Sequence, residues 1–177
     1  MQFYAGRLTA EQLSVPDLPF EPEQATELAL AELQKLQRRF PRVFVMGSSL
    51  GGFYATWLAQ HTGVAAVLIN PAVRPFDLFE HYLGPNRHYY TGVTHELTMA
   101  HIAQLRALDC PQLQHPQRLL LLLQTGDETL DYRLAAELYR RCPAWLEGGG
   151  NHSFEHFIER MPMILAWAQR MSCRAEY

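Results

Sequence analysis

Residues 47–51 read Gly-Ser-Ser-Leu-Gly and carry a serine with a glycine two positions to either side. This spacing fits the pattern G-x-S-x-G, in which the central serine, here Ser49, lies on a sharp turn between a strand and a helix. The N-terminus of such a helix presents unpaired N–H groups and a positive dipole end beside the serine. The pattern therefore predicts that Ser49 is a nucleophile and that the N–H of Leu50 stabilises an oxyanion.

Two other interpretations of this segment are weaker. Ser48 is a second hydroxyl, but it lacks the symmetrical glycine spacing, so we interpret it as a structural neighbour. A glycine-rich turn of this kind also occurs in phosphate-binding loops. The apolar run before the motif, the helical pattern after it and residues later in the chain favour the nucleophile.

A carboxylate that can orient a histidine is predicted after a late strand. Hydrolases that use G-x-S-x-G carry serine, carboxylate and histidine in this order along the chain. The apolar run at residues 118–124 is followed by Asp127, which we choose as the triad acid. Glu128 and Asp131 are close competitors, because a triad acid is defined by geometry. Asp131 also suits an N-cap or first-turn position of the following helix.

The predicted general base is His152, which follows a run of glycines after the last expected strand. Its late position completes the order serine, carboxylate, histidine. The other histidines lie on expected helices or in the central excursion and are interpreted as solvated or packed: His61, His81, His88, His95, His101, His115 and His156. His152 and His156 form the one pair at helical ligand spacing. No third ligand accompanies them, so no metal site is expected.

Strand and helix patterns alternate along the chain and place these side chains at strand ends. Short apolar runs predict strands at residues 42–47, 65–70, 118–124 and 144–147. Helical periodicity predicts helices at residues 21–39, 50–61, 132–141 and 154–171. This alternation is typical of an α/β fold, with a mainly parallel sheet and helices on both faces.

The chain of 177 residues is expected to form a single domain, residues 1–177. Within it, a cap-like excursion is expected at about residues 72–116, where the alternation weakens. Residues 75–90, which include Pro75, Gly84 and Pro85, look like a loop, and roughly residues 94–108 look like a helix. An excursion of this length inside a compact domain is more often functional than idle.

Charge and hydropathy exclude several classes of partner. The formal net charge is −3 and basic residues form no long run, so a nucleic-acid partner is not expected. The most apolar stretch, residues 119–123, is far shorter than the roughly 20 residues of a membrane helix. The start of the chain lacks a secretory signal, which predicts a cytoplasmic protein. Cys110, Cys142 and Cys173 lack the spacing that is typical of a zinc site or a disulfide framework, so we interpret them as reduced cysteines without a functional role.

Several segments of the sequence resemble the bacterial YqiA-type esterase family, also called the UPF0227 proteins. These segments span most of the chain and comprise residues 47–58, 70–76, 124–128 with 130–133, and 147–152. The resemblance implies an α/β-hydrolase fold and esterase or thioesterase activity without a cofactor. By position it supports Ser49, Asp127 and His152 as the catalytic residues.

Members of that family open with a strand that ends in a loop containing His-Gly, and no such segment precedes residue 13 here. The resemblance therefore implies an N-terminally shortened fold that lacks the opening strand and the second oxyanion donor. We expect Met1 to be an internal methionine or a misassigned start. Arg74 follows the strand after the nucleophile helix and is a candidate to bind an acyl-chain carboxylate or a phosphate. A surface or ion-paired arginine is the alternative.

Together these features predict a serine esterase or thioesterase that hydrolyses small acyl substrates through a Ser-His-Asp triad. A second hypothesis is a hydrolase-fold scaffold or binding protein that has the triad but an incomplete oxyanion hole. Acyl transfer or peptide cleavage at the same residues is a third hypothesis, because fold and triad do not separate these reactions.

Overall fold

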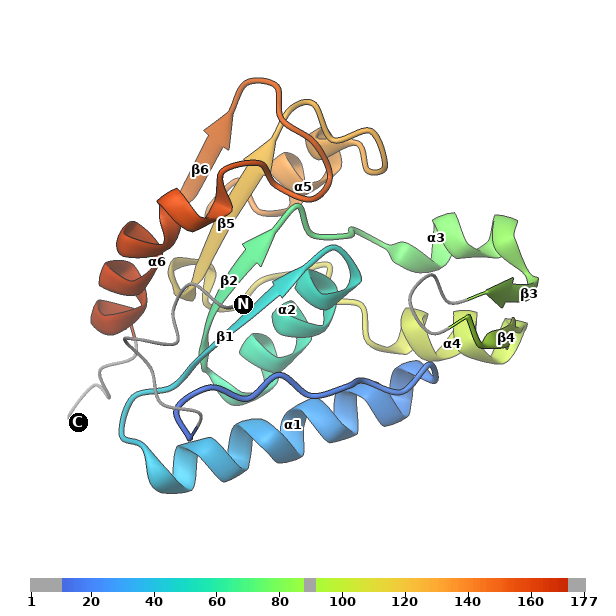
Figure 1. The fold of residues 1–177 in the computed structure, drawn as a ribbon, viewed down its shortest axis with the longest axis horizontal. Coiled ribbons are helices and arrows are strands. Elements are labelled where there is room, and N and C mark those ends of the chain that lie inside the picture. The colour runs from blue at the N-terminus through green and yellow to red at the C-terminus, as the bar shows by residue number, and fades with distance from the viewer. Residues whose placement is uncertain (1–10, 88–91, 172–177) are drawn as a thin grey trace.

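The computed structural model describes residues 11–87 and 92–171 of the chain (Figure 1). Three sequence predictions concern residues outside this part: the shortened start, which involves residues 1–10, and the assignments of His88 and Cys173. The elements in chain order are α1 (Pro22–Arg39), β1 (Phe44–Ser48), α2 (Leu50–Thr62), β2 (Ala65–Ile69), α3 (Pro75–Phe79), the 3-10 helix η2 (Glu80–Tyr82), β3 (Gly84–Arg87), β4 (Thr94–Leu97), α4 (Met99–Ala107), the 3-10 helix η3 (Pro116–Arg118), β5 (Leu119–Gln124), α5 (Tyr132–Leu138), β6 (Ala144–Glu147) and α6 (Phe157–Met171).

Parallel strands form the central sheet, which has four strands in the order β1-β2-β5-β6. The register of β1 on β2 runs from Phe44 opposite Ala65 to Ser48 opposite Ile69. The strands point the same way in Figure 1, so their carboxyl ends meet at one edge of the sheet. The predicted α/β fold with a mainly parallel sheet is confirmed.

Successive side chains of β2 and β5 point to opposite faces of the sheet, and each face has its own apolar core. Ala66, Leu68 and the odd-numbered leucines of β5 pack with α1, α2 and α5. Ala65, Val67 and the even-numbered leucines of β5 pack against α6. Helices therefore cover both faces, which explains why β5 is an unbroken apolar run rather than an alternating one.

The central excursion contains more regular structure than its sequence predicted. β3 and β4 form an antiparallel pair, with Gly84 opposite Leu97. The predicted helix over residues 94–108 is wrong at its start, because residues 94–97 pair with β3 as a strand. The helix α4 begins only at Met99, after Thr98, whose N–H donates to Nδ1 of His101 at 3.0 Å. The prediction of a loop at residues 75–90 likewise missed α3 and β3, because the proline and glycine residues of this segment are typical of turns.

The excursion is packed against the helices that lead to the candidate site. Phe76 of α3 and Ile102 and Leu105 of α4 share one apolar cluster with Ala25 of α1 and Phe53 of α2. Each of these side chains is at most 5% exposed. The excursion therefore adjoins the helix that begins directly after Ser49.

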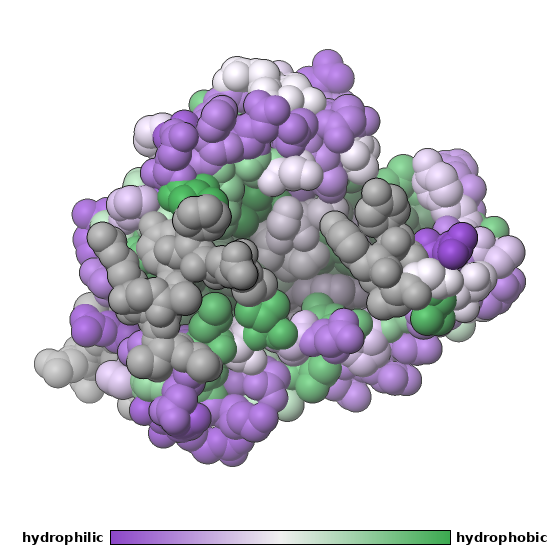
Figure 2. Space-filling model, in the orientation of Figure 1, coloured by the Kyte–Doolittle hydropathy of each residue, from purple (hydrophilic) through white to green (hydrophobic). Residues whose placement is uncertain are grey.

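The face drawn in Figure 2 is mostly hydrophilic toward its rim, and apolar residues gather nearer its centre. Met46 of β1 is one of the exposed apolar side chains, with a relative exposure of 41%.

None of the helices within residues 11–87 and 92–171 combines the length and the apolarity that a bilayer span requires.

Candidate active site

Ser49 lies between β1 and α2 in a backbone conformation that non-glycine residues rarely adopt. Its φ is 54° and its ψ is −123°, so the chain turns sharply between strand and helix. A Cβ atom at position 47 would overlap the carbonyl oxygen of Gly51, and a Cβ atom at position 52 would lie 2.7 Å from Cβ of Pro71. Glycine is therefore required at positions 47 and 52. The spacing predicted the first of these, but its second glycine, Gly51, has no atom within 4 Å of where a Cβ atom would lie.

The end of β2 and the residues that follow it hold this turn through two backbone hydrogen bonds, and a third joins the turn to α2. The N–H of Ser49 donates to the carbonyl of Ile69 at 3.0 Å. The carbonyl of Ser49 accepts from the N–H of Ala72 at 3.0 Å and from the N–H of Gly52 at 2.9 Å. Ser48, in contrast, is the last residue of β1 and lies in its regular register. The two serines thus lie in different backbone conformations, since Ser48 is part of a strand and Ser49 forms the turn.

His152 and Asp127 form a hydrogen-bonded pair. Nδ1 of His152 lies 2.8 Å from Oδ2 and 3.0 Å from Oδ1 of Asp127. The Asp127 side chain is only 2% exposed, whereas that of His152 is 22% exposed. An ionised carboxylate can only accept, so Nδ1 carries the proton and Nε2 is left as the acceptor nitrogen of the neutral ring. This is the tautomer that a general base needs.

The carboxylate of Asp127 is itself fixed in place by the loop after β5. Its Oδ1 accepts from the N–H of Thr129 at 2.9 Å and from the N–H of Leu130 at 2.8 Å. Charge-assisted bonds to backbone N–H groups stabilise an ionised carboxylate and restrict its rotation. Asp127 therefore presents a fixed acceptor to the imidazole.

The two competing carboxylates make other contacts. Asp131 is the N-cap of α5, where its side chain accepts from the N–H of Arg133. The Arg133 side chain binds the same carboxylate and lowers the pKa of Asp131 below its usual range. The interpretation of Asp131 as a helix cap is thus confirmed. Glu128 accepts at Oε2 from the backbone N–H of His152 at 3.0 Å. Of these three acids, Asp127 is the one bonded to the imidazole.

Ser49, Asp127 and His152 follow three different strands at the same edge of the sheet. They come after β1, β5 and β6, whose carboxyl ends lie together (Figure 1). Asn70, directly after β2, connects two of them. Its Nδ2 donates to the carbonyl of His152 at 3.1 Å, while the preceding residue, Ile69, accepts from the N–H of Ser49. Ser49 and His152 are therefore hydrogen-bonded to two consecutive residues, Ile69 and Asn70 respectively.

Two buried amides at this edge were missed by the sequence analysis. Asn70 directly follows β2, Gln124 is the last residue of the neighbouring strand β5, and each is 2% exposed. Oε1 of Gln124 accepts from the N–H groups of Asn151 and Glu155, and so holds the loop that carries His152. The available signal was a polar residue at the carboxyl end of an otherwise apolar strand, since a buried amide must find hydrogen-bond partners.

Arg74 lies at the N-cap of α3 and is paired with Asp77, with 2.6 Å between Nε and Oδ2. That bond raises the pKa of Arg74 and lowers that of Asp77. The guanidinium also lies 5.1 Å from the centre of the Phe76 ring. The alternative of an ion-paired surface arginine is therefore confirmed.

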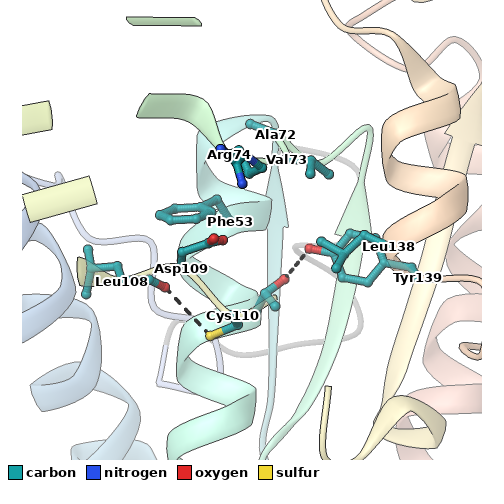
Figure 3. A pocket seen from close by; sticks show the side chains of 10 residues that line it. Phe53, Ala72, Val73, Arg74, Leu108, Asp109, Cys110, Leu138 and Tyr139 are labelled. Carbon is teal, nitrogen blue, oxygen red and sulfur yellow. Dashed lines mark hydrogen bonds between the residues drawn. The ribbon is translucent and has the colours of Figure 1, made fainter. Parts of the chain in front are cut away.

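Arg74 also borders a small pocket beside α2 (Figure 3). Apolar side chains and the hydrogen-bonded hydroxyls of Thr56 and Tyr139, 2.8 Å apart, line much of it. The pocket has about 10 Å³ of space for the centre of a water molecule, roughly what a single water needs. This pocket is therefore too small for an acyl substrate.

The described cysteines have the properties of inert thiols. Cys110 and Cys142 are both free. Burial raises the pKa of each thiol to about 11. Because the thiolate is the reactive form, neither cysteine is a competitive nucleophile near neutral pH.

Within the described part of the chain, no three side chains from His, Cys, Asp and Glu come close enough to hold a metal ion. His156, the possible partner of His152 at helical spacing, instead lies 3.4 Å from a carboxylate oxygen of Glu159. The side chains around His152 therefore offer hydrogen bonds rather than a ligand cluster.

The family model described as "Uncharacterised protein family (UPF0227)" matches residues 1–169. The chain belongs to this family. The resemblance that the sequence motifs indicated is thus confirmed, and the match covers the segments that carry Ser49, Asp127 and His152.

Solved structures share the fold of this UPF0227 protein. A candidate hydrolase from Agrobacterium vitis S4 is 24% identical, with a TM-score of 0.61 over 85% of this chain and 68% of that one. A monoacylglycerol lipase from Paleococcus ferrophilus is 16% identical, with a TM-score of 0.59 over 86% and 76%. Est1E from Butyrivibrio proteoclasticus with bound ferulic acid is 14% identical, with a TM-score of 0.60 over 85% and 67%. The UPF0227 protein therefore has the α/β-hydrolase fold.

Proposed function

We propose that this protein is a serine hydrolase that cleaves carboxylic esters or thioesters. One observation carries the proposal. A buried carboxylate, that of Asp127, binds Nδ1 of His152 at the sheet edge where Ser49 lies in a strained strand-to-helix turn. Strained residues cluster at active sites, and an oriented imidazole beside a serine is the arrangement that activates a hydroxyl for attack on a carbonyl.

In the proposed reaction, Oγ of Ser49 attacks the acyl carbon and Nε2 of His152 takes the hydroxyl proton. The C–O or C–S bond of the substrate then breaks, and the leaving alcohol or thiol takes that proton from His152. Water attacks the resulting acyl-serine, gives a proton to His152 and releases the acid, after which the proton returns to Oγ. Asp127 keeps Nδ1 protonated and stabilises the imidazolium in both steps.

The negative charge that develops on the acyl oxygen would lie against the N-terminus of α2. This helix begins at Leu50, directly after Ser49, and continues to Thr62. Its first N–H groups have no partner within the helix, and its dipole places positive charge at this end. We assign the N–H of Leu50 as an oxyanion donor, a contribution usually worth about 10² to 10³ in kcat.

The comparisons support an acyl ester as the substrate class. The lipase from Paleococcus ferrophilus is named for an ester substrate, and Est1E was solved with an aromatic carboxylic acid. Both share the fold of this chain, and a fold alone does not define a reaction. The site chemistry therefore carries the proposal, and the esters are its first substrates to test.

The test is covalent labelling with a fluorophosphonate, which reacts with activated serines. The protein should be labelled at Ser49, and Ser49→Ala should abolish labelling and lower kcat for a p-nitrophenyl ester by about 10⁴ to 10⁶. Ser48→Ala is the matched control and should retain labelling. Equal losses in the two variants would contradict the assignment of Ser49. A folded protein that resists the probe would support the scaffold hypothesis instead.

A further inference from the structure

We propose that Asn70 and Glu128 are positioning residues that hold the main chain of His152 from both sides. Nδ2 of Asn70 donates to the carbonyl of His152, and Oε2 of Glu128 accepts from its N–H. This inference rests on the proposed function, because it assigns the two side chains the task of keeping the base in reach of Ser49.

Asn70 is placed for this task by the backbone at the end of β2. It is 2% exposed and has a φ of 38°, a left-handed conformation that asparagine tolerates better than most residues. Its N–H continues the sheet by donating to Leu122, and its Oδ1 accepts from the N–H of Gln124. Its two Nδ2 hydrogens are then left for the carbonyls of Asn151 and His152, each at 3.1 Å.

The same short segment also holds the nucleophile. Ile69 and Ala72, on either side of Asn70, bind the N–H and the carbonyl of Ser49, both at 3.0 Å. A bond from Asn70 to the His152 carbonyl therefore links the base to the turn that carries the serine through a few consecutive residues. That bond, together with the contacts of Gln124 to the loop of His152, sets the relative position of the two groups.

The loop that carries His152 needs such support because glycines precede it. Gly149 and Gly150 have φ values of 76° and 73°, and glycine has the largest backbone freedom of any residue. Thr125 and Gln124 bind the N–H groups of Gly149 and Asn151, which fixes the start of the loop. At His152 itself the two main-chain bonds come from Asn70 and Glu128.

Glu128 and Asp127 are neighbours in the chain and accept hydrogen bonds from different groups of His152. Asp127 binds the imidazole at Nδ1, and Glu128 binds the peptide N–H at 3.0 Å. The ring is thus oriented by one carboxylate while its backbone is anchored by the next. A displacement of about 1 Å at a reacting group can reduce the rate by about 10²-fold, so loss of an anchor should be visible in kcat.

The experiment measures kcat and KM for a p-nitrophenyl ester with the full chain and single variants. Glu128→Ala and Asn70→Ala should each lower kcat by about 10- to 100-fold, with KM changed by less than about 3-fold. Glu128→Gln keeps an oxygen that can accept from the His152 N–H and should restore most of kcat. Tyr139→Phe removes a buried hydrogen bond to Thr56, away from His152, and should retain kcat.

Each outcome decides the proposal. Glu128 is exposed, so its variants should fold even where Asn70→Ala does not. The proposal is overturned if Glu128→Ala retains kcat, or if Glu128→Gln loses as much as Glu128→Ala, since charge rather than the hydrogen bond would then matter. Wild-type protein without esterase activity or fluorophosphonate labelling would refute the proposed function itself. An active wild type with unaffected variants would refute only the positioning roles.

Discussion

Replacing Asp127 with asparagine changes a hydrogen-bond acceptor into a donor at the point where it meets the His152 ring. Oδ1 of Asp127 accepts from the N–H groups of Thr129 and Leu130, so the amide oxygen of the new side chain should stay with these two donors. Its NH₂ group would then face Nδ1 of His152, now 2.8 Å from Oδ2. A donor there favours the tautomer with the proton on Nε2, which cannot accept the proton of Ser49.

The expected cost is large because geometry is preserved while the tautomer is wrong. This change in a serine–histidine–aspartate triad lowers kcat by about 10⁴. At 1.36 kcal/mol per tenfold change, the activation free energy rises by about 5 kcal/mol. The Asp127 side chain is only 2% exposed, so water has little access with which to replace the lost acceptor.

The assay is single-turnover acylation by a p-nitrophenyl ester, which follows attack by Ser49 directly. Asp131→Asn is the matched control, because asparagine caps a helix as well as aspartate and the Asp131–Arg133 ion pair is exposed. It should acylate at the wild-type rate with little change in melting temperature. An Asp127→Asn variant that keeps a tenth or more of the rate, or an equal loss in both variants, would refute the reasoning.

Three further predictions concern other parts of the molecule. Gly47→Ala should abolish fluorophosphonate labelling and lower the melting temperature, because its Cβ would overlap the Gly51 carbonyl; wild-type labelling would contradict the tight turn. Burial raises the pKa of the Cys110 thiol to about 11. Iodoacetamide should therefore alkylate Cys110 far more slowly at about pH 8 than it alkylates the thiol of a small cysteine peptide, as mass spectrometry can measure. Hydrogen bonds, chiefly from Gln124, lower the pKa of Glu147, so its contribution to stability is present at neutral pH and lost as the pH falls through that lowered pKa. Glu147→Gln should therefore lower the melting temperature more at about pH 7 than at about pH 3, and an equal loss at both would contradict this origin.

Local sequence patterns predicted most of the elements because each pattern reports the environment of its own residues. The apolar run at residues 118–124 predicted a strand, and β5 is that strand, one residue shorter at its start. The excursion was predicted less well, since residues 94–97 form a strand only by pairing with residues 84–87. That pairing joins two segments whose own composition favours a loop and a helix.

The sequence by itself determined the fold class, the family and the position of the turn at Ser49, because these depend on periodicity, on motif spacing and on the need for glycine two positions before the serine. It left three acids, Asp127, Glu128 and Asp131, as candidates to contact His152. Only the tertiary structure assigned them to the ring, the backbone N–H and a helix cap, since hydrogen bonds depend on distances of about 3 Å between atoms that are far apart in the chain. The contact of Asn70 with the His152 carbonyl has the same cause: two strands with no local relation end at one edge of a parallel sheet.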